Sequence, residues 1–341
     1  MEFGKSLLIY ILGIISGLSI VPAVVFAQER LQLHQDKAPG KRTPVPVVPT
    51  APAAVAAAPA AAPTAAPAPA GPVVAAALVV PGQLTLAELR DIWLHLDAPS
   101  KLPYEQLMNY EPGRGKFHSQ AGQDKWVEKV FSGQRNLFVV ESGALNGISH
   151  SNSIFFETER QWDCLLVEAN PYLWPEVRSR NRKCHFLTAG LSITKDKGEF
   201  PFKLAGPLGG FTDTMASSHV WRADHEIKNN APWMTGSRGS GKVINVSAFP
   251  LYQVMAALNR TTLDYWSLDT EGSELAILQG SGVEHFELGV LTIEHNNEMP
   301  KRQQIQDFLH QHGTERVVAG GQDDFYANPS YFRKRNLPFP K

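Results

Sequence analysis

An α/β fold with a mostly parallel sheet is the architecture that the sequence predicts. From about residue 117 onward, short apolar runs alternate with segments of helical apolar spacing, which is the order of repeated βαβ units. The apolar run at residues 138–140 suits a buried parallel strand, and Gly143 and Gly147 let the loop after it approach a ligand with its backbone. The next strand ends in Glu168, roughly 20 residues or slightly more beyond the glycines, which is the spacing of a Rossmann-like unit.

The remaining elements follow in the same alternation. Each predicted strand is a short apolar run, and each predicted helix follows a turn or capping signal. Strands are expected at residues 138–140, 164–168, 184–187, 243–246, 263–269, 289–295, 315–318 and 324–327. Helices are expected at residues 120–131, after 150, from 171, at 251–258, from 271 and after 300. The last two strands are expected to finish the sheet in the antiparallel direction.

Two segments depart from this alternation. Residues 84–96 have helical apolar spacing and a start signal at Thr85, which predicts a short helix packed on the domain or on a partner. Residues 206–241 are rich in Gly, Ser, Asn and Trp without a clear period, so we expect an inserted loop or lid. Within this insertion, Trp221 and Trp233 are candidates for contact with a ligand.

The amino-terminal quarter of the chain has a different composition. Residues 7–27 carry no charge and would be roughly 30 Å long as a helix, which is enough to cross a bilayer. A cleaved signal peptide is the alternative, because Lys5 precedes the run and small residues close it. We expect a tail at 1–6, a signal anchor at 7–27, a disordered Pro/Ala linker at 28–82, a leader helix and connection at 83–116, the main domain at 117–330 and a tail at 331–341.

Either form of the amino-terminal segment directs the chain to the secretory pathway. We expect a single-pass, type II protein whose large domain faces the lumen, because long domains translocate largely regardless of charge. The sequons at Asn245 and Asn259 agree with this orientation. The formal net charge of −1 gives no indication of nucleic-acid binding.

The two cysteines, Cys164 and Cys184, stand at the starts of the predicted second and third strands. Neighbouring parallel strands could bring them within bridging distance, and an oxidising lumen would permit a disulfide. We favour the alternative, two small buried core residues. No CxxC or Cys/His cluster indicates zinc.

Acidic residues end four of the predicted strands: Glu141, Glu168, Asp269 and Glu294. In a doubly wound sheet, ligands bind outside the carboxyl ends of the strands. Four acids at such positions are better explained by a polar site than by chance. The sequence therefore predicts a ligand site at this edge of the sheet.

The loop after the first strand, with the sequence FVVESGALNG, differs from the dinucleotide motif. It has one glycine fewer and an acid, Glu141, at the strand end, which favours adenosine without a pyrophosphate, as in S-adenosylmethionine. Glu168 is placed to accept both ribose hydroxyls, and Asn152 could reach the methionine end of this cofactor. The expected cofactor-binding residues are Glu141, Gly143, Ala144, Gly147, Asn152, Glu168 and Asn170.

The candidate catalytic residues are Asp269, Glu271 and His295. Asp269 would project into the cleft and orient an acceptor hydroxyl or take its proton. Glu271 is equally explained by the positive end of the following helix, and His295 is either a general base or structural. A divalent metal held by Asp269, Glu294 and Asn296 is not excluded, because oxygen ligands from adjacent strand ends suit magnesium.

Five motifs, taken in order, resemble the FkbM-type methyltransferase domain. They are HSQAGQDKWVEKVF (118–131), FVVESGALNGISHSNS (138–153), CLLVEANP (164–171), LDYWSLDTEGSELAIL (263–278) and LTIEHN (291–296). The similarity covers about residues 117–327, and the whole layout resembles the Star-like branch of animal membrane proteins. Asn146 departs from the pattern, because this position is often acidic in the group.

The resemblance implies a Rossmann-like methyltransferase fold with seven strands that binds S-adenosylmethionine. In FkbM enzymes it implies methylation of a hydroxyl on a sugar or other small molecule. Star-like proteins imply a single membrane span and movement of membrane cargo, such as growth-factor precursors, between endoplasmic reticulum, Golgi and endosomes, with the plasma membrane as a further location. We therefore expect an anchored protein with an FkbM-type domain, either an O-methyltransferase or a catalytically silent trafficking protein.

Overall fold

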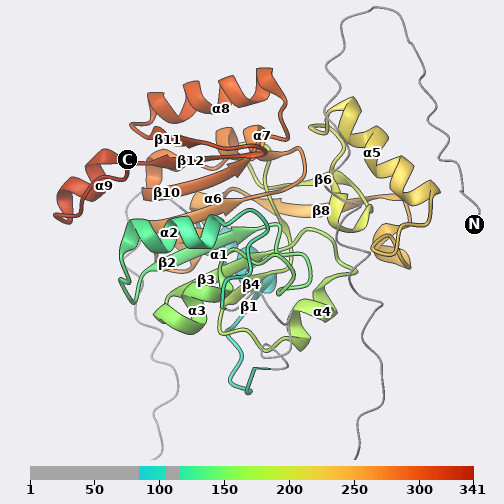
Figure 1. Cartoon of the computed structure of the whole chain (residues 1–341). Helices are drawn as coiled ribbons and strands as arrows, with labels where there is room; N and C mark the ends of the chain where they lie inside the picture. The colour runs from blue at the N-terminus through green and yellow to red at the C-terminus, as the bar shows by residue number, and fades with distance from the viewer. Residues whose placement is uncertain (1–83, 105–115) are drawn as a thin grey trace, which may run out of the picture. The chain divides into compact units, whose positions relative to one another are not determined.

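The computed structural model describes residues 84–104 and 116–341, and its centre is an eight-stranded mixed sheet (Figure 1). The strand order is β1-β4-β3-β2-β9-β10-β12-β11. The five parallel strands are β4 (His185–Leu187), β3 (Asp163–Val167), β2 (Phe138–Ser142), β9 (Thr262–Leu268) and β10 (Glu287–Glu294). The strands paired antiparallel at the edges are β1 (Leu96–Asp97), β12 (Asp323–Ala327) and β11 (Glu315–Ala319).

A second sheet corrects the expected single sheet of seven mostly parallel strands. Its four strands, in the order β5-β8-β6-β7, are β5 (Gly190–Leu191), β8 (Val243–Phe249), β6 (Gly198–Lys203) and β7 (Gly210–Phe211). The predicted strand at 243–246 lies here and pairs antiparallel with β6. Burial of Val246 and Ala248 against Phe202 and Phe211 explains this placement. An apolar run predicts a strand, but it does not identify the partner strand.

Alternate residues of the parallel strands enter two separate cores, one on each face of the large sheet. Val140 and Leu165 belong to the core covered by α1, α6, α7 and α8, whereas Val139 and Leu166 belong to the core covered by α2, α3, α4 and α9. This division follows from the two-residue period of a strand. The helices are α1 (Leu86–Leu94), α2 (Gln123–Phe131), α3 (Ile154–Arg160), α4 (Trp174–Ser179), α5 (Ser217–Lys228), α6 (Leu251–Ala257), α7 (Glu274–Gly280), α8 (Met299–Gln311) and α9 (Pro329–Lys334).

The predicted helix at 84–96 is α1, and its start signal is confirmed. The Thr85 hydroxyl accepts from the Glu88 amide at 3.2 Å, and the Glu88 carboxylate accepts from the Thr85 amide at 2.6 Å. This reciprocal pair is a capping box. Ile92 is fully buried, and the Trp93 indole donates to the Ala257 carbonyl at 3.2 Å. The helix therefore packs on α6 of its own domain.

The predicted loop at 206–241 contains a twelve-residue helix, α5, which lies beside the second sheet (Figure 1). The buried residues of this helix are only His219 and Ala223. Ala223 packs with Leu208 and Met234 in a small core of its own. A face made of a histidine and an alanine gives little hydrophobic periodicity, which is why the sequence pattern missed the helix.

The amino-terminal predictions fall largely outside the described residues. The expected span at 7–27 and linker at 28–82 are not described, and none of the helices in 84–104 and 116–341 is long and apolar enough to cross a membrane. At the other end, α9 crosses the predicted boundary at residue 330. Its Tyr331 and Phe332 are buried in the core, so the segment after 330 begins as part of the domain.

Cys164 and Cys184 form a disulfide, with their Cα atoms 4.5 Å apart. The preference for two free core thiols is therefore wrong. The cause is the parallel register, which places Leu165 opposite His185 and so sets the two cysteines side by side at the entry to β3 and β4. Register between strands depends on packing across the sheet and is not visible in either strand alone.

Removing this disulfide is expected to destabilise the domain. The Cys164→Ala/Cys184→Ala variant should lose about 2–4 kcal/mol of unfolding free energy, because the bridge restricts the unfolded chain over a separation of 20 residues. Urea unfolding measures the loss, and the reduced wild-type protein should unfold at the midpoint of the variant. An unchanged midpoint in both would contradict the stabilising role.

Candidate active site

A cavity lies at the carboxyl ends of the parallel strands. It holds about 870 Å³ of empty space, part of it open to solvent, and Glu141, Gly143, Glu168 and Asp269 are among its lining residues. The second sheet and the insertion close the other side through Leu191, Phe202, Gly206, Pro207, Gly210 and Phe211.

The glycine loop requires glycine at its first position. Gly143 has φ +89°, and a Cβ atom there would lie 1.8 Å from the Asp269 carbonyl oxygen. The Gly143 and Ala144 amides both donate to the Val167 carbonyl, at 3.1 and 3.0 Å. Gly143 is therefore required by the close approach of β9 as well as by the cavity. Gly147, with φ +80°, packs against Val177 and does not line the cavity.

Glu168 is buried at the wall of the cavity and is held by backbone amides. Its two carboxylate oxygens accept from the Leu145 amide at 2.7 Å and from the Asn170 amide at 2.8 Å. Burial raises the pKa of this carboxyl to about 7, although the amides of Asn170, Leu145 and Ala169 act in the opposite direction. Glu168 thus links the glycine loop to the end of β3 and changes charge near neutral pH.

Glu141 organises the turn that follows the glycine loop. Its carboxylate accepts from the Ser151 hydroxyl and the Asn152 amide, both at 2.8 Å, and from the Ser153 hydroxyl. The Asn152 side chain donates to the Ser267 hydroxyl at 2.8 Å. Its Oδ1 atom is buried and has no hydrogen-bond partner among the described residues, and Asn152 lines the cavity. The Asn152 amide oxygen is therefore able to accept a hydrogen bond from a ligand.

Besides Gly147, two more of the expected cofactor-binding residues do not line the cavity. Ala144 is buried in the core beside α2 and α3. Asn170 is also buried; its side chain accepts from the Tyr172 amide at 3.1 Å and donates to the Arg238 carbonyl at 3.1 Å. Both residues shape the loops of the site from behind, and Asn170 also ties the insertion to the end of β3.

Three carboxyl groups meet across the ends of β9 and β10. Asp269, Glu271 and Glu294 each offer an oxygen within 4.8 Å of the others. Burial, together with Asp323 and Glu274, raises the pKa of Asp269 to about 7. Burial and the neighbouring Asp269 carboxyl raise the pKa of both Glu271 and Glu294 well above the usual range. The cluster is therefore able to bind protons or a cation near neutral pH.

The composition of this cluster differs from the expected metal-binding set. The Asn296 side chain donates to Glu294 Oε2 at 2.7 Å, and Glu271 supplies the third carboxyl instead. Glu274, one turn further along, is satisfied by the Gly272 amide at 3.0 Å and by Lys301 at 3.1 Å. Glu274 thus acts as a structural anion at the start of α7.

His295 does not reach the cavity. Its side chain is buried, its Nδ1 accepts from the Asn297 amide at 3.1 Å, and its Nε2 lies 3.6 Å from Asp324. Burial lowers the pKa of this imidazole. Successive residues at the end of β10 point in opposite directions, so Glu294 joins the acidic cluster while His295 turns away from it. We therefore do not assign His295 the role of a general base.

His219 is a residue near the site that sequence reasoning missed. It comes from α5, its Nε2 lies 3.1 Å from the Leu208 carbonyl and 3.6 Å from Glu271 Oε2, and it is buried. Burial lowers the pKa of this imidazole. The insertion was predicted as a loop. The sequence therefore marked His219 only as a histidine in a segment without hydrophobic periodicity. By contrast, Trp221 and Trp233 are exposed and do not line the cavity.

The sequence from Glu141 in β2 to Arg316 in β11 matches a protein family. Residues 141–316, slightly more than half of the 341-residue chain, match the model of the methyltransferase FkbM domain. The chain belongs to the FkbM methyltransferase family. No curated protein matches the chain.

Solved structures of three methyltransferases resemble the chain at low identity. The methyltransferase FkbM of Methylobacillus flagellatus KT is 11% identical, with a TM-score of 0.35, over 57% of this chain and 44% of that chain. The precorrin-6y C5,15-methyltransferase of Geobacter metallireducens GS-15 is 10% identical, with a TM-score of 0.33, over 64% and 92%. The human methyltransferase 10 domain containing protein is 12% identical, with a TM-score of 0.29, over 70% and 89%.

The residues that match the FkbM domain include the acids at the ends of the parallel strands, on the side of the large sheet where the cavity lies. The match begins at Glu141, includes Glu168, Asp269 and Glu294, and ends at Arg316 in β11. The insertion with α5 also lies inside it. The chain spans less than half the length of the Methylobacillus FkbM protein, so the substrates of that whole protein are not transferred to this chain.

The raised pKa of Asp269 predicts a pH-dependent stability. Between the ordinary value of 3.8 and about 7, Asp269 holds a proton in the folded state but not in the unfolded chain. This group therefore stabilises the fold fully below pH 3.8 and loses that contribution as the pH rises to about 7. Asn cannot ionise, so Asp269→Asn should raise the unfolding free energy relative to wild type more at about pH 8 than at about pH 5.

Urea unfolding at the two pH values measures this difference. Asp307→Asn, at an exposed position on α8, is the matched control and should show no such change between them. An Asp269→Asn effect that is equal at both pH values would show that Asp269 is ionised in the folded protein across this range.

Proposed function

We propose that this domain binds S-adenosylmethionine and O-methylates a hydroxyl of a sugar or another small molecule. The observation that carries the proposal is the buried Glu168 carboxyl, which lies at a cavity beside a glycine loop in a chain of the FkbM methyltransferase family. A carboxylate at the end of the second strand of such a unit accepts ribose hydroxyls. Membership of a methyltransferase family supports this cofactor in general terms.

The residues around the cavity fit the parts of this cofactor. Glu168 would accept the ribose hydroxyls, and Asn152 Oδ1, which lacks a partner among the described residues, would accept from the ammonium group. Leu191, Phe202 and Phe211 form an apolar wall against which a purine can pack. When bound, the cofactor supplies an electrophilic methyl group.

The acidic cluster fits the other half of the reaction. An acceptor hydroxyl must lose its proton as its oxygen is methylated, and a carboxylate with a pKa near neutral suits that task. Asp269 has such a pKa and lines the cavity together with Glu271. We assign Asp269 the role of proton acceptor and Glu271 the role of orienting the hydroxyl, while burial and the Asp323 carboxyl keep the pKa of Asp269 high.

A divalent cation is a second candidate ligand of this cluster. Asp269, Glu271 and Glu294 present oxygens close enough to one another for one ion, and carboxylates are ligands that magnesium prefers. A bound cation would neutralise the cluster and bind the acceptor oxygen directly. Unfolding experiments with and without magnesium decide whether the cluster binds a cation. If it does, magnesium should raise the stability of wild type and leave that of Asp269→Asn unchanged.

A lumenal location is proposed on two observations. The disulfide between Cys164 and Cys184 suits an oxidising compartment, and both sequon asparagines, Asn245 and Asn259, are exposed. The alternative function in that location is the movement of cargo, such as growth-factor precursors, by a single-pass membrane protein without catalysis. The cofactor titration separates the two, because a silent domain has no need to bind S-adenosylmethionine.

Calorimetric titration of the full-length chain with S-adenosylmethionine tests the cofactor. Wild type should bind saturably, and Glu168→Ala should bind about 100-fold more weakly, because two hydrogen bonds to a charged group are lost. Glu287→Ala is the matched control: this glutamate lies at the opposite end of the sheet, where it pairs with Lys334 and Arg335, and its removal should leave binding unchanged. Absence of heat with wild type would refute the cofactor proposal.

Treatment of the cell-expressed protein with an N-glycosidase tests the location. Gel mobility should increase for wild type and should be unaffected for the Asn245→Gln/Asn259→Gln variant, because a lumenal domain exposes both acceptors to the glycosylation machinery. The third Asn-x-Ser/Thr triplet, at Asn328, contains Pro329 and serves as an internal negative. Identical mobilities of treated and untreated wild type would argue against lumenal exposure.

A further inference from the structure

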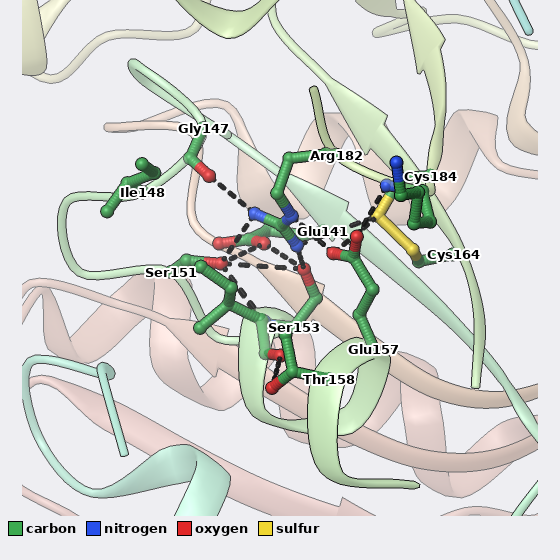
Figure 2. A network of polar contacts seen from close by, with 12 residues as sticks. Glu141, Gly147, Ile148, Ser151, Ser153, Glu157, Thr158, Cys164, Arg182 and Cys184 are labelled. Atoms are coloured by element: carbon green, nitrogen blue, oxygen red, sulfur yellow. Dashed lines mark hydrogen bonds and ion pairs between the residues drawn. A yellow bond between two sulfur atoms is a disulfide. The ribbon is translucent and has the colours of Figure 1, made fainter. Parts of the chain in front are cut away.

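Arg182 is a buried cation that contacts the glycine loop at Gly147 (Figure 2) and does not line the cavity. It lies in the segment between α4 and β4, two residues before the disulfide-bonded Cys184. Its side chain is 2% exposed and forms an ion pair with Glu157 of α3, which is 1% exposed. A guanidinium in such a place is tolerated only if its donors are satisfied.

The remaining donors of Arg182 are directed at the loop and turn that follow β2. Its guanidinium donates to the Gly147 carbonyl, to the Ser153 hydroxyl at 2.8 Å and to the Ser151 hydroxyl at 3.4 Å. Figure 2 shows these contacts converging on one side chain. One planar group therefore fixes three points of the segment between Gly147 and Ser153.

The same two serines connect Arg182 to the strand end. The hydroxyls of Ser151 and Ser153 accept from Arg182 and donate to the carboxylate of Glu141, the last residue but one of β2 (Figure 2). The turn is thus held between a cation and an anion through hydroxyl groups that are oriented by both. The disulfide joins Cys184, next to Arg182, to β3 and so limits movement of the cation.

A second ion pair on α3 provides a comparison. Arg160 pairs with Glu128 of α2, donates to the Glu159 carbonyl in its own helix and lies over the Phe155 ring. The Arg160 pair joins two helices and touches no part of the cavity wall. Arg182 differs because its additional donors go to the segment that carries Asn152 and follows the glycine loop.

We propose that Arg182 is a positioning residue, which holds the segment 147–153 in the shape that binds the cofactor. The predicted effect on cofactor binding rests on the proposed function, whereas the predicted ordering of the loop by Arg182 does not. The guanidinium fork is required because a lysine ammonium can pair with Glu157 but cannot reach the Gly147 carbonyl and the Ser153 hydroxyl at the same time.

Hydrogen exchange and calorimetry on the full-length chain test the proposal together. The variant Arg182→Met/Glu157→Gln removes both charges and so avoids an unpaired buried carboxylate. Amides of residues 144–153 should exchange about tenfold faster than in wild type, and the Kd for S-adenosylmethionine should rise about tenfold. Arg182→Lys should show the same two changes, whereas Arg160→Met/Glu128→Gln should show neither.

Each outcome bears on one of the two proposals. Faster exchange throughout the domain, or equal effects in the Arg160 pair, would show that Arg182 serves only general stability and would overturn the positioning role. Full rescue by Arg182→Lys would overturn the requirement for the fork. If wild type does not bind the cofactor, the proposed function fails, and local exchange at 144–153 alone still decides whether Arg182 orders the loop.

Discussion

Several carboxylates lie at the edge of the sheet where the parallel strands end, and they are largely shielded from water. Each of them therefore needs hydrogen-bond donors or protons from the protein, and the site depends on which of these it has. Parallel strands end at the same edge of a sheet, so Glu141, Glu168, Asp269 and Glu294 meet there. Glu141 accepts from serine hydroxyls and an amide, and Glu168 accepts from two amides. Burial raises the pKa values of Asp269 and Glu294, and neighbouring carboxyl groups raise them further. Burial of these groups therefore creates a site that is ready for protons, a cation or a hydroxyl donor.

The wall opposite these acids comes from a separate part of the fold. Phe211 of β7 packs so close to Gly190 that a Cβ atom there would lie 2.5 Å from its ring, and Gly210 approaches the Glu271 carbonyl. The Thr214 hydroxyl lies 2.7 Å from that of Ser273, beside α7. The second sheet and the insertion thus contact the segment that follows β9, at Glu271 and Ser273. In this arrangement the large sheet supplies polar groups to the cavity, whereas the second sheet supplies apolar side chains such as Phe202 and Phe211.

The parts of the fold and of the site that the sequence predicts are those that depend on neighbouring residues. The glycine loop, the acid at the end of β3 and the capping box at Thr85 each depend on a few consecutive positions. His219 could not be found this way, because α5 has almost no apolar face. His295 was placed in the site because it follows a strand, but strand alternation turns it toward Asp324.

By itself, the sequence determined the order of the helices and strands, the glycine loop and the acids that follow the strands, because periodicity and turn chemistry are properties of adjacent residues. Only the tertiary structure decided that β8 joins a second sheet, that Cys164 meets Cys184, and that Arg182 reaches the loop after Gly147. Each of these depends on strand register and on packing between residues far apart along the chain. Such contacts are selected by the burial of a whole face at once, and no local pattern contains that information.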